Sequence, residues 1–197
     1  QKTDFLKPYP IQTILDIGAN VGQFATELRK IYPQAKIYSF EPLSDCFKTL
    51  NNNMSKDKNF QSFNLALGDT DGTLTMHYNN YSPSSSLKEL KTLHKEAFPY
   101  ATEVVDQQVA VKRLDDITMD IKPDLLIKVD VQGFEGQVIL GGIETFKKAK
   151  IVMIENSFVE LYEGQMLFDE LYAKMRELGF AYRGSFNQKL HPKTGER

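Results

Sequence analysis

The chain has 197 residues, and its 24 Lys and Arg against 26 Asp and Glu give a net charge of −2. Nucleic acid is therefore excluded as the expected main partner, because no excess positive field attracts a polyanion. This length suffices for one hydrophobic core without disulfides or metals, so we expect a single domain over residues 1–197. No apolar run is long enough for a membrane span, and the first ten residues lack the apolar core of a secretion signal. Cys46 is the one cysteine in the sequence, which agrees with a reducing compartment. We therefore expect a soluble, cytoplasmic protein with no membrane partner.

Strands and helices alternate in the first part of the chain, as in a mostly parallel sheet covered by helices on both faces. Apolar runs of strand length predict strands at residues 11–17, 35–41 and 60–68. Apolar residues at helical spacing predict a helix at 21–32 and another that begins near Ser44.

The alternation breaks in an insertion around residues 69–114. Two β-rich runs, at 69–78 and 104–114, flank a polar, serine-rich segment that leads into a charged helix at 79–98. We expect the two runs to be extra strands, added at an edge of the sheet or over it, and the insertion to act as a lid.

Regular alternation resumes after the insertion. It predicts strands at 124–130, 149–156 and 180–186, and helices at 134–148 and 166–179. The fold class expected from the whole pattern is therefore α/β, a Rossmann-like three-layer sandwich with a mostly parallel sheet.

A glycine turn, in the stretch ILDIGANVGQF, connects the first strand to the first helix through Asp16, Gly18 and Gly22. Glycines let a ligand approach the backbone, and the start of a helix offers free N–H groups to an anion. A dinucleotide-binding turn would carry glycines where Asn20 and Gln23 stand, and the phosphate loop of nucleotide hydrolases is absent. The turn therefore predicts a ligand site but disfavours a pyrophosphate.

Glu41 follows the second predicted strand. A carboxylate at this place accepts hydrogen bonds from both hydroxyls of a ribose and disfavours a 2′-phosphate. The turn and Glu41 together predict a nucleoside-bearing cofactor.

The strand at 124–130 contains a lysine in an apolar run. Alternation places Leu126, Lys128 and Asp130 on one side of this strand. Since lysine is rarely buried without a partner, we expect a carboxylate nearby, with Asp130 or Glu155 as candidates. Asp130 also ends the strand, where ligands bind in folds of this class.

Five stretches resemble, in their order and spacing, the FkbM family of S-adenosylmethionine-dependent methyltransferases; they are LDIGANVGQF, YSFEP, NLALGD, LLIKVDVQGFEGQVILGG and IVMIEN. The first marks only the wider methyltransferase superfamily. The fourth is specific, because family members typically carry the equivalents of Lys128, Asp130, Gly133 and Glu135. The resemblance covers residues 13–186 and implies the class I methyltransferase fold, whose last strand has no candidate in the sequence after residue 186.

The resemblance implies that the turn holds the methionine part of S-adenosylmethionine, that Glu41 holds the ribose, and that residues after the third strand lie at the adenine. The cofactor-binding residues so implied are Asp16, Gly18, Ala19, Asn20, Gly22, Glu41, Ala66, Leu67 and Asp69.

Methyl transfer is an in-line displacement, for which alignment of the acceptor and a base for its proton suffice. Asp130 is the first candidate for the base and Glu135 the second, with Lys128 tuning their charge or orienting the substrate. Asp130, Glu135 and Glu155 are three oxygen ligands that the fold could bring together around a divalent metal. We nevertheless expect no metal, because no close acidic cluster and no histidine pair at ligand spacing occurs. Glu155 and the insertion, which offers hydroxyl groups suited to a small molecule or saccharide, are the expected substrate-binding parts; the residues in the insertion are Tyr81, Ser84, Ser85 and Ser86.

Two other functions stay open beside O-methylation. A nicotinamide-dependent oxidoreductase is supported by Gly18, Gly22 and Glu41 but opposed by Asn20 and by the lack of a second nucleotide-binding half. A non-catalytic cofactor-binding module would keep the same fold. The sequence indicates no oligomeric state.

Overall fold

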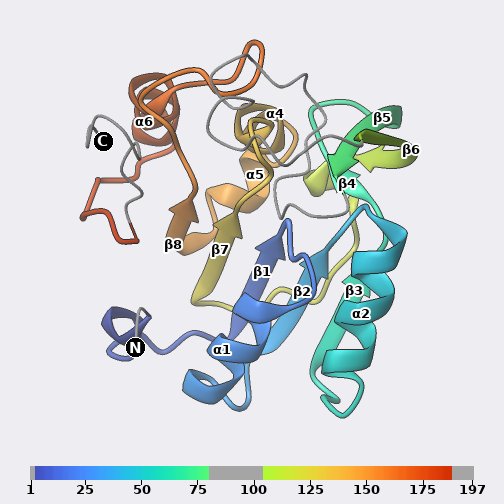
Figure 1. Ribbon diagram of the computed structural model, residues 1–197. Coiled ribbons are helices and arrows are strands. Elements are labelled where there is room, and N and C mark those ends of the chain that lie inside the picture. Colours follow the sequence, from blue (N-terminus) through green and yellow to red (C-terminus); the bar gives the residue numbers. More distant parts are fainter. Residues whose placement is uncertain (1–2, 80–103, 188–197) are drawn as a thin grey trace.

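The computed structural model of the chain describes residues 3–79 and 104–187, and its centre is a five-stranded sheet in the order β3-β2-β1-β7-β8 (Figure 1). All neighbouring strands in it run parallel. The strands are Thr13–Ile17 (β1), Lys36–Phe40 (β2), Phe60–Phe63 (β3), Leu125–Val129 (β7) and Ala149–Ile154 (β8). The strand order reverses between β1 and β7, so a ligand crevice is expected at the carboxyl ends of these two strands.

Helices cover both faces of this sheet (Figure 1). Alternate strand residues supply the two cores: Ile14 and Leu126 pack with residues of α1 and α2, whereas Leu15 and Ile127 pack with residues of α4, α5 and α6. The helices are Gln23–Ile31 (α1), Ser44–Met54 (α2), Glu135–Leu140 (α4), Ile143–Phe146 (α5) and Phe168–Glu177 (α6), with 3-10 turns at Asp4–Leu6 and Leu114–Asp116. The predicted Rossmann-like α/β sandwich is confirmed.

The insertion forms a second sheet in the order β4-β6-β5. Its strands are Ala66–Leu67 (β4), Gly72–Asn79 (β5) and Val104–Lys112 (β6), with β5 and β6 antiparallel. The two extra strands are thus confirmed, but they pair with each other rather than with the main sheet. The second sheet rests on the start of α2, where Val109 and Val111 share a core with Leu43 and where Gln107 Nε2 donates a hydrogen bond to Ser44 Oγ at 3.1 Å.

Two predicted elements are split. The strand expected at 60–68 stops at Phe63, because the side-chain amide of Asn64 donates to the carbonyl oxygens of Glu41 and Pro42 and redirects the chain into β4. The helix expected at 134–148 breaks at two consecutive glycines between α4 and α5. Backbone contact explains this break, since a Cβ on the first of them, Gly141, would lie 1.8 Å from the carbonyl oxygen of Gly68.

The strand expected at 180–186 is wrong, because this segment has no regular structure. Gly179, with φ +92°, turns the chain at the end of α6. The ring of Tyr182 then packs against Phe168 and Tyr172, with centroid distances of 5.6 and 6.2 Å, so the segment follows α6. Within the described residues the main sheet therefore ends at β8.

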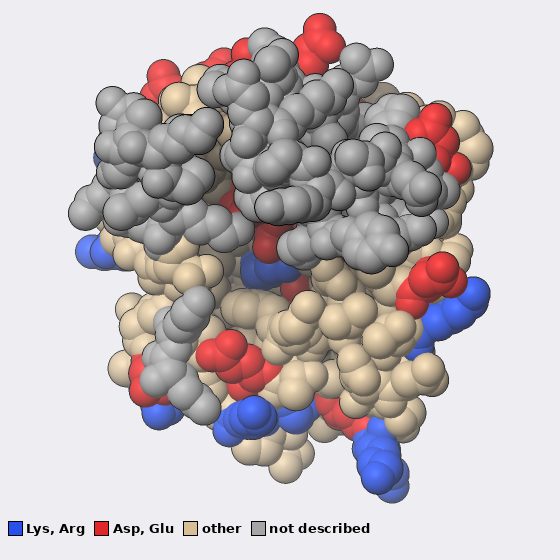
Figure 2. Space-filling view, in the orientation of Figure 1, with Lys and Arg blue, Asp and Glu red and all other residues tan. Residues whose placement is uncertain are grey.

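Charges of both signs are interspersed on the face shown in Figure 2, and the Lys and Arg side chains form no continuous area there. Near the middle of this face, blue and red atoms share a hollow over the region where β1 and β7 end. A bilayer-spanning helix, long and apolar enough, is absent from residues 3–79 and 104–187.

Candidate functional site

The turn that follows β1 has an unusual backbone. Gly18, Asn20 and Gly22 have left-handed φ values of +74°, +50° and +89°, a conformation that glycine and asparagine adopt most readily. The N–H groups of Gly18 and Ala19 both donate to the carbonyl oxygen of Phe40 at 3.0 Å. The turn is therefore fixed to the end of β2.

Glu41 lies directly beyond β2 and is 5% exposed. Its carboxylate accepts hydrogen bonds from the N–H of Asn20 at 2.8 Å and from the N–H of Leu43 at 2.9 Å. Burial raises the pKa of Glu41, while these two bonds and the charge of Lys128 oppose that rise. A carboxylate has about four acceptor positions, so Glu41 keeps capacity for further donors beside the turn.

Lys128 lies at the centre of a buried charge network. It stands opposite Asp16 in the parallel register of β7 and β1, and its side chain is 13% exposed. Its Nζ donates to the carbonyl oxygen of Gly18 at 2.7 Å and lies 3.3 Å from Asp16 Oδ1 and 3.8 Å from Asp130 Oδ2. Burial alone lowers the pKa of Lys128, but the charges of Asp16 and Asp130 raise it above its ordinary value. One ammonium group thus connects the turn to the end of β7.

Asp16 is fully buried beneath the turn. Neither of its carboxylate oxygens has a hydrogen-bond partner, so the ion pair with Lys128 is what compensates its charge. Burial raises the pKa of Asp16, and Lys128 opposes the rise. The carboxylate expected near Lys128 is confirmed, and of the two candidates Asp130 is the one that forms an ion pair with it. The shorter pair with Asp16 was missed, because the register of β1 against β7 cannot be read from the sequence.

Asp130 begins the loop after β7, close to the glycine turn. Its N–H donates to the carbonyl oxygen of Ile17 at 3.1 Å, and its own carbonyl lies against Gly18, where a Cβ would approach that oxygen to 1.8 Å. The side chain of Asp130 is 40% exposed. Asp130 is therefore the accessible acid of the network, while Asp16 is the buried one.

Glu135, the second candidate base, is 1% exposed and stabilises this loop. Its Oε1 accepts the N–H groups of Val131 and Gly133, both at 3.2 Å, and its Oε2 is buried without a partner. Burial raises the pKa of Glu135. Its carboxylate is thus turned into the loop that Asp130 begins.

Gln132 and Tyr162 were missed by the sequence analysis. Gln132 Nε2 donates to Asp130 Oδ1 at 2.8 Å and to the carboxylate of Glu155, and its Oε1 accepts a hydrogen bond from the Tyr162 hydroxyl at 2.7 Å. Gln132 lies inside the family-specific motif VDVQGFEG, so its place in that motif could have marked it as a candidate site residue. Tyr162 carries no such signal, because it follows β8 in a segment without periodicity.

Three further predicted cofactor residues lie in or just after β4. Ala66 and Leu67 are 6% and 2% exposed and belong to packed cores, whereas Asp69 is half-buried with its carbonyl bound by Arg113. In the described ranges, no three His, Cys, Asp or Glu side chains are arranged to hold a metal ion. The predicted substrate-binding residues of the insertion lie outside the described residues; they are Tyr81, Ser84, Ser85 and Ser86.

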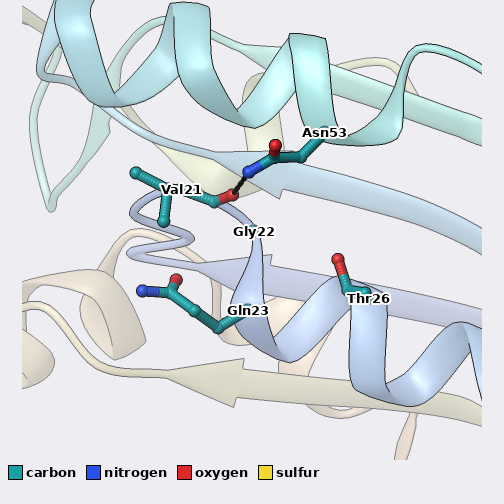
Figure 3. A pocket seen from close by; sticks show the side chains of 5 residues that line it. All are labelled: Val21, Gly22, Gln23, Thr26 and Asn53. Carbon is teal, nitrogen blue, oxygen red and sulfur yellow. Dashed lines mark hydrogen bonds between the residues drawn. The ribbon is translucent and has the colours of Figure 1, made fainter.

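An open pocket of about 380 Å³ lies on the outer side of the turn, between α1 and α2 (Figure 3). Asn53 Nδ2 donates to the carbonyl oxygen of Val21 at 2.8 Å, so the last turn of α2 is fixed to the glycine turn. The lining residues are Val21, Gly22, Gln23, Thr26 and Asn53. The pocket shares Gly22 with the predicted cofactor site, and its lining includes no acidic or basic side chain.

Gly18→Ala is expected to lower the free energy of unfolding by about 2–3 kcal/mol, because it adds left-handed strain to a collision with the carbonyl oxygen of Asp130. Urea denaturation measures this loss. Substitutions at two other glycines separate the effect of backbone strain from that of the collision. Gly179 has φ +92° and open space, so Gly179→Ala should cost only about 1 kcal/mol of strain. Gly72 has neither constraint, and Gly72→Ala should be close to neutral. Equal losses for Gly18→Ala and Gly179→Ala would show that the contact with Asp130 imposes no constraint.

Comparison with known proteins identifies the family. The family described as "Methyltransferase FkbM domain" matches residues 16–182. A protein named 2-O-methyltransferase NoeI, from Sinorhizobium fredii (strain NBRC 101917 / NGR234), is 32% identical over 169 residues, which cover 81% of this chain and 68% of that protein. Methyltransferase sdnD from Sordaria araneosa is 29% identical over 192 residues, covering 85% of this chain and 73% of that protein.

A solved structure agrees with the fold. Methyltransferase FkbM from Methylobacillus flagellatus KT superposes with a TM-score of 0.50 at 17% identity, over 74% of this chain. The chain spans only 32% of that structure's length, and this likeness supports the fold alone. With the match over residues 16–182, the resemblance noted in the sequence is confirmed: the chain belongs to the FkbM family of methyltransferases.

Proposed function

We propose that the chain is an S-adenosylmethionine-dependent O-methyltransferase that acts on a hydroxyl group of a small molecule or saccharide. One observation supports this most strongly. The turn that would hold the methyl donor and the acid that would serve the acceptor are joined twice, by the contact of Gly18 with the Asp130 carbonyl and by Lys128 Nζ, which contacts both. These two links would align a bound donor with the acceptor, which is the main requirement of an in-line displacement.

The residues around the turn fit the proposed cofactor. Gly18 and Gly22 leave backbone free of side chains in left-handed conformations, where a Cβ would collide with neighbouring atoms. Glu41 retains acceptor capacity for ribose hydroxyls. Asp69, half-buried after β4, remains a candidate for the adenine. When bound, S-adenosylmethionine supplies an electrophilic methyl group on a sulfonium.

We assign to Asp16 the role of supporting the turn rather than contacting the cofactor, because it is fully buried and paired with Lys128. Ala66 and Leu67 receive a packing role on the same ground.

Asp130 is the base in this proposal. It would take the hydroxyl proton of the acceptor as the acceptor oxygen displaced sulfur from the methyl carbon, with the electron pair of the broken carbon–sulfur bond left on sulfur. Lys128 orients its carboxylate from 3.8 Å, and Glu135 holds the loop from beneath. The name of one relative, 2-O-methyltransferase NoeI, supports oxygen as the acceptor atom.

Calorimetry with S-adenosylmethionine, its demethylated product S-adenosylhomocysteine and NAD tests the cofactor. We expect heat from the first two and none from NAD. Transfer of radiolabelled methyl groups to a panel of saccharides and small alcohols then tests the acceptor. Binding of NAD alone would reject the proposal in favour of an oxidoreductase, whereas cofactor binding without any transfer would favour a non-catalytic module.

Glu41→Gln is expected to weaken S-adenosylhomocysteine binding by about 10- to 100-fold, because hydrogen bonds to a charged carboxylate contribute about 1.5–3 kcal/mol. The folded state should persist, since the amide oxygen can still accept an N–H from Asn20 or Leu43 and a buried charge is removed. Calorimetry measures the affinity. Asp45→Asn, at an 86% exposed side chain at the start of α2, is the matched control and should bind normally. Equal affinities of the two variants would exclude Glu41 from the site.

A further inference from the structure

Gln132 bridges the two acidic side chains that follow the ends of β7 and β8. Its Nε2 donates to Asp130 Oδ1 at 2.8 Å and also to the carboxylate of Glu155. An amide nitrogen carries two protons, so it serves both acids at once. Two carboxylates that bind the same nitrogen lie close enough to repel each other when both are ionised. The uncharged amide of Gln132 holds them together by donating one hydrogen bond to each.

Tyr162 determines which way the amide of Gln132 points. Its hydroxyl donates to Gln132 Oε1 at 2.7 Å, and its side chain is 2% exposed. Burial raises the pKa of Tyr162, and the charges of Glu155, Glu135 and Asp130 raise it further, so the hydroxyl stays a donor. With its oxygen engaged by Tyr162, the amide must turn its nitrogen toward the two acids.

The backbone around Gln132 is shaped for this bridge. Gln132 itself has φ +54°, and Gly133 has φ +95°. The ring of Tyr162 lies against Gly133, where an added Cβ would approach the ring to 2.8 Å. The loop and the ring therefore fit each other, and the hydroxyl reaches the amide from a fixed position.

We propose that Gln132, oriented by Tyr162, is a positioning residue that holds the side chains of Asp130 and Glu155 together at the acceptor side of the site. This inference rests on the proposed function, because its catalytic consequence requires Asp130 to act as the base. Gln132 keeps the Asp130 carboxyl group correctly aimed, and it also makes Glu155 part of the same unit.

The first test needs neither cofactor nor acceptor. In the ¹⁵N-labelled protein, the side-chain amide resonances of Gln132, assigned by their loss in Gln132→Met, should lie away from those of solvent-exposed glutamines and exchange slowly. Tyr162→Phe keeps the ring against Gly133 but removes the donor, so both resonances should move toward the exposed positions while core methyl resonances stay in place. Exposed-type resonances in the unmodified protein would overturn the bridge.

The second test reads the consequence for catalysis. In Tyr162→Phe and in Gln132→Asn, kcat/KM for the acceptor should fall by about 10- to 100-fold through misplacement of the base, with the Kd of S-adenosylhomocysteine unchanged. Gln132→Asn keeps an amide and suits the left-handed backbone, but its side chain is one methylene too short to reach both acids. Unchanged kcat/KM in both variants would overturn the positioning role. Failure of the unmodified protein to bind S-adenosylhomocysteine would instead reject the proposed function, and the resonances would still report on the bridge.

Discussion

Lys128→Met is expected to lower the free energy of unfolding by about 3–5 kcal/mol, because it leaves one member of a buried ion pair without its partner. Asp16 is fully buried, and the ammonium group of Lys128 at 3.3 Å is the charge that compensates it. Methionine fills a similar volume, so lost packing contributes little. Urea denaturation at pH 7 measures the change, and the variant should also bind S-adenosylhomocysteine poorly, since the carbonyl of Gly18 loses its donor.

The penalty of Lys128→Met is expected to shrink as the pH falls. Burial raises the pKa of Asp16 in the unmodified protein, and removal of Lys128 takes away the effect that opposes this rise. The folded variant therefore holds a proton on Asp16 that the unfolded chain, with an Asp pKa of about 3.9, has released. Stability falls as the pH rises through the folded pKa and recovers below it.

The double variant Lys128→Met, Asp16→Asn is the control for this argument. It removes both charges, so most of the lost stability should return at pH 7. A penalty that stays constant from pH 7 down to about pH 4, the unfolded pKa of Asp, or one that Asp16→Asn leaves unchanged, would contradict the ion-pair explanation.

Asp130→Asn is expected to slow methyl transfer by about 10²- to 10⁴-fold, the usual contribution of a positioned base. The amide oxygen can still accept the bond from Gln132, so the loop and the affinity for S-adenosylhomocysteine should be preserved. Initial rates with radiolabelled cofactor at saturating acceptor measure the loss.

Glu135→Gln is the matched comparison for Asp130→Asn. Its amide oxygen retains the bonds to Val131 and Gly133, and the site is 1% exposed, so turnover should stay close to that of the unmodified protein. The opposite result, with Glu135→Gln nearly inactive and Asp130→Asn active, would transfer the role of the base to Glu135.

The parts of the site that could be predicted from the sequence are those encoded within one short stretch. The left-handed turn at Gly18, the acid at Glu41 and the pair of Lys128 with Asp130 all follow from residue types at fixed local spacing. Asp16 required the register between two strands, and Tyr162 required the path of an irregular segment, so neither could be assigned in advance.

The predicted strand at 180–186 failed for a related reason. Alternation of apolar residues shows that a segment suits a sheet, but it does not show which surface will bind that segment. Here Tyr182 packs on the aromatic rings of Phe168 and Tyr172 on α6. The strands of the insertion show the same limit, because their type was predicted correctly but the sequence did not specify that they pair with each other.

The second sheet is attached to the rest of the molecule at one end of its ladder. Residues 80–103 connect the ends of β5 and β6 at the pair Asn79 and Val104, the end of the ladder farthest from β4. The base of the ladder is anchored to the start of α2, just beyond the residue proposed to hold the ribose. A substitution at the far end of the ladder is therefore separated by the length of β5 and β6 from the anchored base, and we expect it to leave the register of the main sheet unchanged.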